Sequence, residues 1–196
     1  QPTVDDLNAL VVGTIAVGIS FIAYQQNTTL LTGTLYLGAA ASALLLREFG
    51  QRTIAQWMQV QVDMELSLEG TAMTLIGALG SFLTGWPLLL LFPVFNEHSL
   101  ESYEHWGKSI DAMWIKRRYW LASGGIIALL AGALILDAVG FSRGAEVASI
   151  FLVFQMLPFD YSKIPTGPLD GSIIIRQSGF MWLIYMGAAL LTVLAV

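Results

Sequence analysis

The chain has 196 residues and a formal net charge of −5, with 12% charged and 56% hydrophobic residues. Its mean hydropathy is +0.68. Soluble domains usually carry about 25% charged residues, so the composition predicts an integral membrane protein. The negative charge argues against nucleic acid as a partner. The chain has no cysteine, which excludes internal disulfides and thiolate metal sites.

Apolar stretches of roughly the length that crosses a bilayer recur along the chain. They predict one all-α polytopic membrane domain, residues 1–196, with about six transmembrane helices and a short interfacial β element. The polar turn at residues 25–28 favours an antiparallel pairing of the first two helices. We expect Pro87 and Pro93 to kink or end the third near Trp86. The predicted spans are residues 8–24, 29–50, 70–95, 119–139, 146–158 and 178–196.

The spacing of apolar residues changes between the second and third spans. Apolar and polar residues alternate strictly over residues 60–68, which is typical of a half-buried β-strand. A lone strand would leave backbone groups unpaired in lipid, so we expect a partner strand, which the pattern does not identify. The strand edge is a candidate surface for docking by strand addition. The partner-binding candidates are its apolar residues Val60, Val62, Met64 and Leu66.

The most polar segment is residues 96–116, which we expect to lie outside the bilayer as an amphipathic surface helix. On a helix, His98, Glu101 and His105 would share one face and have a spacing that suits a metal ion. A solvated segment rich in acidic residues explains them equally well. The basic residues 116–118 precede the fourth span and predict a cytoplasmic location for that end.

One polar motif lies near the end of the second apolar stretch: Arg47-Glu48-Phe49-Gly50-Gln51. Its spacing is that of His-Glu-x-x-His, in which two histidines one helical turn apart bind zinc and the glutamate polarises the attacking water. About 120 residues later the chain reads Gly167-Pro168-Leu169-Asp170-Gly171, near Phe154-Gln155-Met156-Leu157-Pro158.

Together these segments resemble the site-2 protease family of intramembrane zinc metalloproteases. The resemblance covers most of the chain from Ala41 to about Trp182. It implies a zinc-binding motif in a membrane helix, a later loop whose aspartate is the third zinc ligand, and a membrane-embedded β-strand where residues 60–68 lie.

The departures from the family pattern concern the zinc ligands themselves. Arg47 and Gln51 stand where the two histidines are expected; arginine is permanently charged and cannot ligate zinc, and glutamine is a weak neutral donor. Only Asp170 remains as a ligand, with Glu48 at the general-base position, and Gln155 stands where the family usually has asparagine. We therefore expect a vestigial site without metal, cofactor or catalysis, in which Arg47 binds Asp170 in place of the metal.

The function that these observations favour is that of a catalytically inactive, protease-like subunit of a larger membrane complex. We expect it to bind other integral membrane proteins in a hetero-oligomer, in the lipid bilayer of the cell membrane. Two alternatives remain open: an active intramembrane metalloprotease with an altered metal site, and a small transporter or channel component with Glu48, Asp63 and Asp170 along a polar path. More simply, Arg47, Glu48 and Arg52 would mark a helix that reaches the headgroups, and Asp170 a tight turn.

Overall fold

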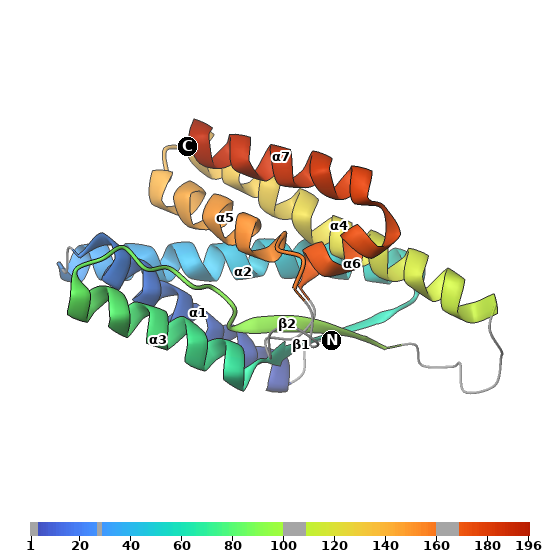
Figure 1. Ribbon diagram of the computed structural model, residues 1–196, viewed down its shortest axis with the longest axis horizontal. Helices are drawn as coiled ribbons and strands as arrows, with labels where there is room; N and C mark the ends of the chain where they lie inside the picture. The colour runs from blue at the N-terminus through green and yellow to red at the C-terminus, as the bar shows by residue number, and fades with distance from the viewer. Residues whose placement is uncertain (1–3, 27–28, 100–108, 160–168) are drawn as a thin grey trace.

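The computed structural model describes residues 4–26, 29–99, 109–159 and 169–196. This part of the chain is mostly helical, which confirms the predicted all-α class, and its strands form one two-stranded sheet (Figure 1). The elements in chain order are α1 (Val4–Gln25), α2 (Leu30–Met58), β1 (Gln61–Leu66), α3 (Leu68–Thr84), β2 (Val94–Ser99), α4 (Ser109–Ala138), α5 (Ser142–Gln155), α6 (Asp170–Gln177) and α7 (Gly179–Ala195).

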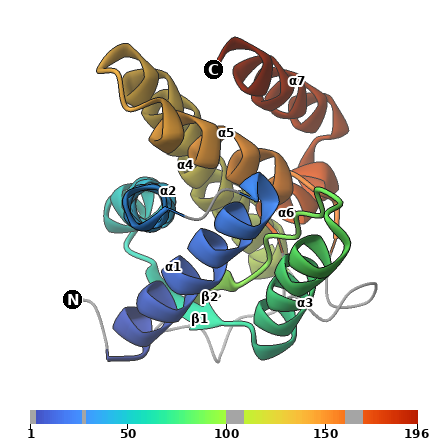
Figure 2. The same cartoon turned by 90° about the vertical axis from the view of Figure 1, so that its left-hand side faces the viewer.

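Helix α2 is the element around which the others are arranged. It packs against α1 and β1 on one side and against α4 and α5 on the other. Figures 1 and 2 show α1, α3 and the strands on the first side, and α4, α5 and α7 on the second. The core contains the small residues Ala39, Ala40 and Ala43 of α2, which let neighbouring helices approach closely.

The ends of α2 and α3 follow from local capping chemistry. The side chain of Thr29 accepts a hydrogen bond from the Thr32 amide and begins α2, which ends where Gln59 takes a left-handed conformation. The Ser67 side chain accepts from the Gly70 amide and begins α3. Gly85, with φ +70°, ends α3.

The alternating segment forms strand β1, as predicted, and its partner is β2. The two strands are antiparallel, with Met64 opposite Asn96. Val62 and Met64 are buried, whereas Asp63 is half-buried and Glu65 exposed, which matches the alternation. The strand is shorter than residues 60–68 because its flanks serve other elements: the Val60 amide binds the Ala55 carbonyl, and Ser67 caps α3.

Two predicted segments differ from the structure. Residues 70–95 are helical only as far as Thr84, close to the expected end near Trp86, because Gly85 turns the chain and the following proline-containing stretch does not continue the helix. The segment 96–116 begins as strand β2 rather than as a surface helix, so His98 lies in a strand and the helical spacing expected for a metal site does not apply. Residues 100–108, which include Glu101 and His105, lie outside the described residues.

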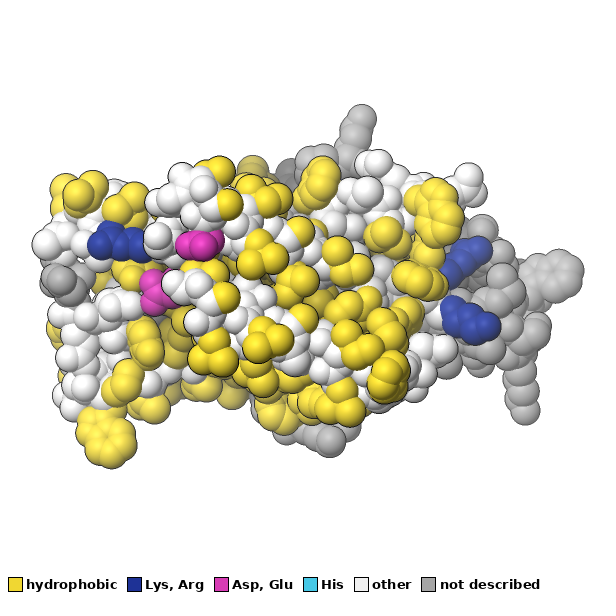
Figure 3. All heavy atoms as spheres, turned by 90° about the horizontal axis from the view of Figure 1, so that it is seen from above, with side chains coloured by type: hydrophobic (Ala, Val, Ile, Leu, Met, Phe, Trp, Pro, Cys, Tyr) yellow, Lys and Arg dark blue, Asp and Glu magenta, His cyan; other side chains and the backbone are white. Residues whose placement is uncertain are grey.

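Three described helices are long and apolar enough to cross a membrane: residues 5–25, 30–58 and 116–138. The apolar helices α3 and α7 have 17 residues each, and α5 has 14. The structure thus supports membrane-spanning character but leaves the prediction of about six spans unconfirmed. Figure 3 shows a face covered mainly by hydrophobic side chains, with charged side chains towards its two ends.

Candidate functional site

Helix α2 brings the residues of the polar motif to two adjoining faces. Side chains four residues apart lie one above the other on a helix, so Arg47 and Gln51 share one face, and Glu48 and Arg52 share the next. Arg47 and Gln51 are 1% and 0% exposed. Such burial of charge inside a helix bundle requires a partner on another element.

The partner of Arg47 is Asp170, the first residue of α6. Arg47 Nε lies 2.8 Å from Asp170 Oδ2, and Arg47 Nη2 lies 3.0 Å from Oδ1. Gln51 Nε2 donates to the same Oδ1 at 3.0 Å. Asp170 is 1% exposed. This contact confirms the predicted pairing of Arg47 with Asp170, and we call these three residues the ion-pair site.

Glycines provide the room for the ion-pair site. A Cβ atom at Gly125 of α4 would lie 2.9 Å from Gln51 Cγ and 3.3 Å from Arg47 Cγ, so only a glycine lets α4 cover these side chains without displacing them. A Cβ atom at Gly171 would lie 2.1 Å from the Met156 carbonyl oxygen. The start of α6 is therefore held against the end of α5, which fixes Asp170 opposite Arg47.

Glu48 takes part in a second polar network, on the adjoining face of α2. Its carboxylate accepts a hydrogen bond from Arg52 Nε. Arg52 Nη2 also lies 3.0 Å from Asp6 Oδ2 of α1, and the Met64 amide of β1 donates to Asp6 Oδ1 at 2.7 Å. The carboxylates of the two sequence motifs are thus paired with different arginines: Asp170 with Arg47, and Glu48 with Arg52. The i, i+4 spacing of Glu48 and Arg52 could have signalled their pairing, but no sequence signal pointed to Asp6.

The residues of the ion-pair site do not fit a zinc ion. A catalytic zinc site uses three protein ligands, whereas positions 47 and 51 offer a cation and an amide whose nitrogen faces Asp170. Both oxygens of Asp170 accept hydrogen bonds from these two side chains. Within the described ranges, no group of three His, Cys, Asp or Glu side chains could hold a metal ion. The site acts chemically as a charge-neutral link between α2 and α6.

The four strand residues predicted to bind a partner face this chain's own core. Val60, Val62 and Met64 are 8%, 6% and 2% exposed, and Leu66 is partly buried against the core. Docking through these side chains would require α1 or α2 to move away.

Gln155, the last residue of α5, is fully buried. Neither atom of its side-chain amide has a hydrogen-bond partner among the described residues. The next residue, Met156, accepts a hydrogen bond at its carbonyl from Trp182 Nε1 of α7 at 2.8 Å. The amide of Gln155 is therefore a destabilising feature close to the start of α6.

A separate polar cluster joins three helices away from the ion-pair site, and no motif or spacing predicts it. Glu146 of α5 accepts hydrogen bonds from Gln25 of α1 at 2.9 Å and from the Tyr36 hydroxyl of α2 at 3.2 Å. The Arg143 guanidinium lies 5.5 Å from the Tyr36 ring centroid. These contacts link the end of α1 and the start of α2 to the start of α5.

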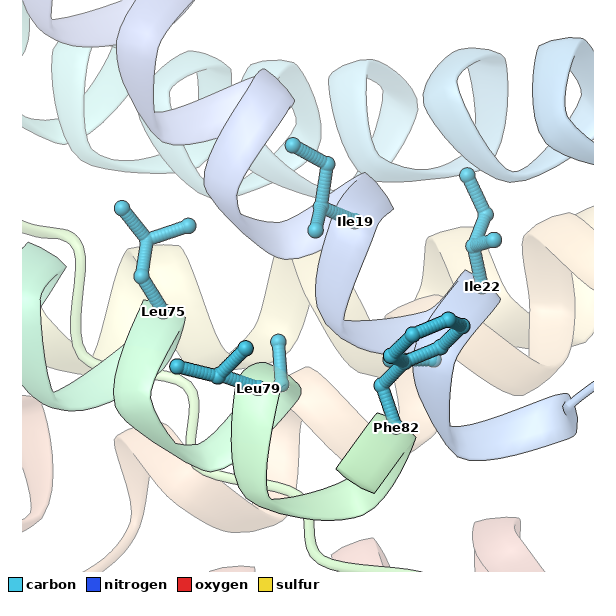
Figure 4. Close-up of a pocket in the computed structure, with 7 residues that line it drawn as sticks. Ile19, Ile22, Leu75, Leu79 and Phe82 are labelled. Carbon is cyan, nitrogen blue, oxygen red and sulfur yellow. The ribbon is translucent and has the colours of Figure 1, made fainter. Parts of the chain in front are cut away.

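An apolar groove of about 360 Å³ lies between α1 and α3 (Figure 4). Its lining has no titratable side chain and therefore offers no acid, base or metal ligand. The residues that line it are Ile19, Ile22, Ala23, Leu75, Ala78, Leu79 and Phe82.

Comparison with family models, with curated proteins and with solved structures found no match to this chain.

Proposed function

We propose that this chain is a catalytically inactive, site-2-protease-like integral membrane protein that serves as a structural or interaction subunit of a larger membrane complex. One observation carries the proposal. Asp170, the last zinc ligand that the family resemblance implies, is engaged on both oxygens by Arg47 and Gln51. An aspartate used in this way is a structural group rather than a metal ligand.

The position of the ion-pair site along α4 supports a role inside the membrane. Gly125, which covers the site, lies nine residues beyond Lys116, where the candidate span of α4 begins. At 1.5 Å per residue this is about 13 Å along the helix, well within a hydrocarbon core about 30 Å thick. An unpaired charge there is costly, and the pairing of Arg47 with Asp170 offsets that cost.

The proposal places the chain in the cell membrane as a polytopic protein. In this arrangement α1, α2 and α4 cross the bilayer, and the shorter helices α3, α5 and α7 complete about six spans. The ion-pair site fixes α6 to α2, the helix that lies between the two sides of the bundle. A fixed bundle with exposed apolar residues such as Phe49 and Trp57 on α2 suits lasting contact with other membrane proteins.

The experiment that tests the proposal is purification of the chain from its own membrane in mild detergent, followed by native mass spectrometry and a cleavage assay. We expect a complex of fixed stoichiometry with at least one other integral membrane protein, and no cleavage that depends on Glu48. A monomer without partners would contradict the proposal. Cleavage that is abolished in Glu48→Gln would contradict it as well and would favour a working protease.

A further inference from the structure

The outer edge of strand β1 is closed by a side chain of α1. In an antiparallel pair, successive residues direct their backbone groups to opposite edges of the strand. The Ser67 amide, just beyond β1, binds the Pro93 carbonyl beside β2. The Met64 amide, on the other edge, donates instead to Asp6 Oδ1 at 2.7 Å. Asp6 therefore occupies the position at which a neighbouring strand would place a carbonyl oxygen.

Asp6 is firmly held in this position. It is 5% exposed, and its second oxygen, Oδ2, lies 3.0 Å from Arg52 Nη2. Arg52 is in turn bound to Glu48. A carboxylate with an amide on one oxygen and a guanidinium on the other has fixed geometry and strong, charge-assisted hydrogen bonds.

Helix α1 carries Asp6 in its first turn and packs against β1 along this edge. In Figures 1 and 2 the start of α1 lies beside the strands. Unprotected strand edges pair readily with strands of other chains, and proteins protect them with charged side chains or with a covering helix. This chain combines both devices in one residue and the helix that carries it.

We propose that Asp6 is an intramolecular guard that keeps the outer edge of β1 from pairing with an extended strand of a second polypeptide. The strand that fits this edge is β1 of another copy of the chain. Its alternating pattern is identical, and antiparallel pairing about a two-fold axis presents the same edge on both sides. The inference uses only these contacts and does not depend on the proposed function.

The test compares Asp6→Leu with the matched control Asp5→Leu, which removes an exposed carboxylate from the same helical turn. Because the chain has no cysteine, a Glu65→Cys substitution in β1 gives one defined site for disulfide cross-linking in membranes. We expect Asp6→Leu to increase cross-linked dimer roughly tenfold, and to accelerate amide exchange in residues 61–66 by a similar factor, given the loss of a charge-assisted hydrogen bond. Asp5→Leu should change neither.

Two further variants keep the test decisive. Leu83→Cys on α3, at a position where leucine is 71% exposed, is a control for general aggregation. Aggregation would increase cross-linking at both cysteine positions, whereas pairing of strand edges should leave cross-linking through Leu83→Cys the same with and without Asp6→Leu. If Asp6→Leu fails to fold, Asp6→Asn, compared with Asp5→Asn, should raise exchange and cross-linking less, because it keeps an oxygen for the Met64 amide. Unchanged exchange in the Asp6 variants would overturn the inference. Faster exchange without more Glu65→Cys dimer would overturn it too.

Discussion

Arg47 and Asp170 are opposite charges buried together, and the cost of separating them is much larger than the net gain from pairing them. Removing one partner of a buried pair typically costs about 3–5 kcal/mol, because it leaves a charge without compensation, whereas replacing both by apolar residues is often nearly neutral. The bidentate contact and the burial of both side chains place this pair in that class.

We therefore predict that Arg47→Met lowers the free energy of unfolding by about 3 kcal/mol or more. The double substitution Arg47→Met with Asp170→Leu should recover most of that loss. Unfolding in mixed detergent micelles, followed by circular dichroism, measures both values. Lys116→Met, at an exposed position, is the control and should have little effect. A single Arg47→Met variant as stable as the native chain would mean that the ion pair is absent in the membrane.

Gln155 gives a second prediction at the residue scale, in which a substitution raises the free energy of unfolding instead of lowering it. Its amide is buried without a partner among the described residues, and such a group costs about 1–3 kcal/mol. Gln155→Met keeps a flexible side chain of similar length without polar hydrogen-bonding groups, so it should raise the free energy of unfolding by about 1 kcal/mol. The same unfolding assay measures the change. A loss of stability would instead show that the amide has a partner that matters.

At the scale of elements, the contact between α2 and α4 depends on two facing glycines. A Cβ atom at Gly50 would lie 2.3 Å from the Gly124 carbonyl oxygen, a distance that requires the helices to separate. We predict that Gly50→Ala destabilises the protein by about 1–3 kcal/mol. Gly38→Ala on the same helix, where a Cβ atom meets nothing within 4 Å, should be neutral or slightly stabilising. Equal effects of both substitutions on the unfolding midpoint would contradict this packing.

The elements that the sequence predicted well have strong local signals. Strict alternation predicted β1, and the second apolar stretch predicted a helix over residues 29–50, which in the structure continues to Met58. The strand β2 has no such signal, and its pairing with β1 is a long-range contact that local pattern does not contain. The same reason explains why the residues of β2 were divided between two other predictions, residues 94–95 as the end of the third span and residues 96–99 as the start of a surface segment.

At the scale of the whole molecule, the two polar networks differ in how far the sequence could predict them. The Arg47 to Asp170 contact joins residues 123 apart, and only the resemblance of two motifs to one family suggested it. The contact of Arg52 with Asp6 belongs to no motif, and periodicity cannot show that the first turn of α1 lies beside Met64 of β1. Prediction from sequence therefore reached the pairing of Arg47 with Asp170 but not the second network, which joins Glu48 and Arg52 to Asp6 and the strand.

The central claim is that Asp170 pairs with Arg47 and does not ligate zinc. Elemental mass spectrometry of the purified, dialysed protein, which gives its zinc content, tests this claim most directly. We predict that the native chain holds far less than one zinc ion per molecule. The Arg47→His, Gln51→His variant should bind about one, because it restores two histidines one turn apart opposite Asp170. Stoichiometric zinc in the native chain that is lost in Asp170→Asn would contradict the account, since Asp170 would then be a metal ligand rather than the partner of Arg47.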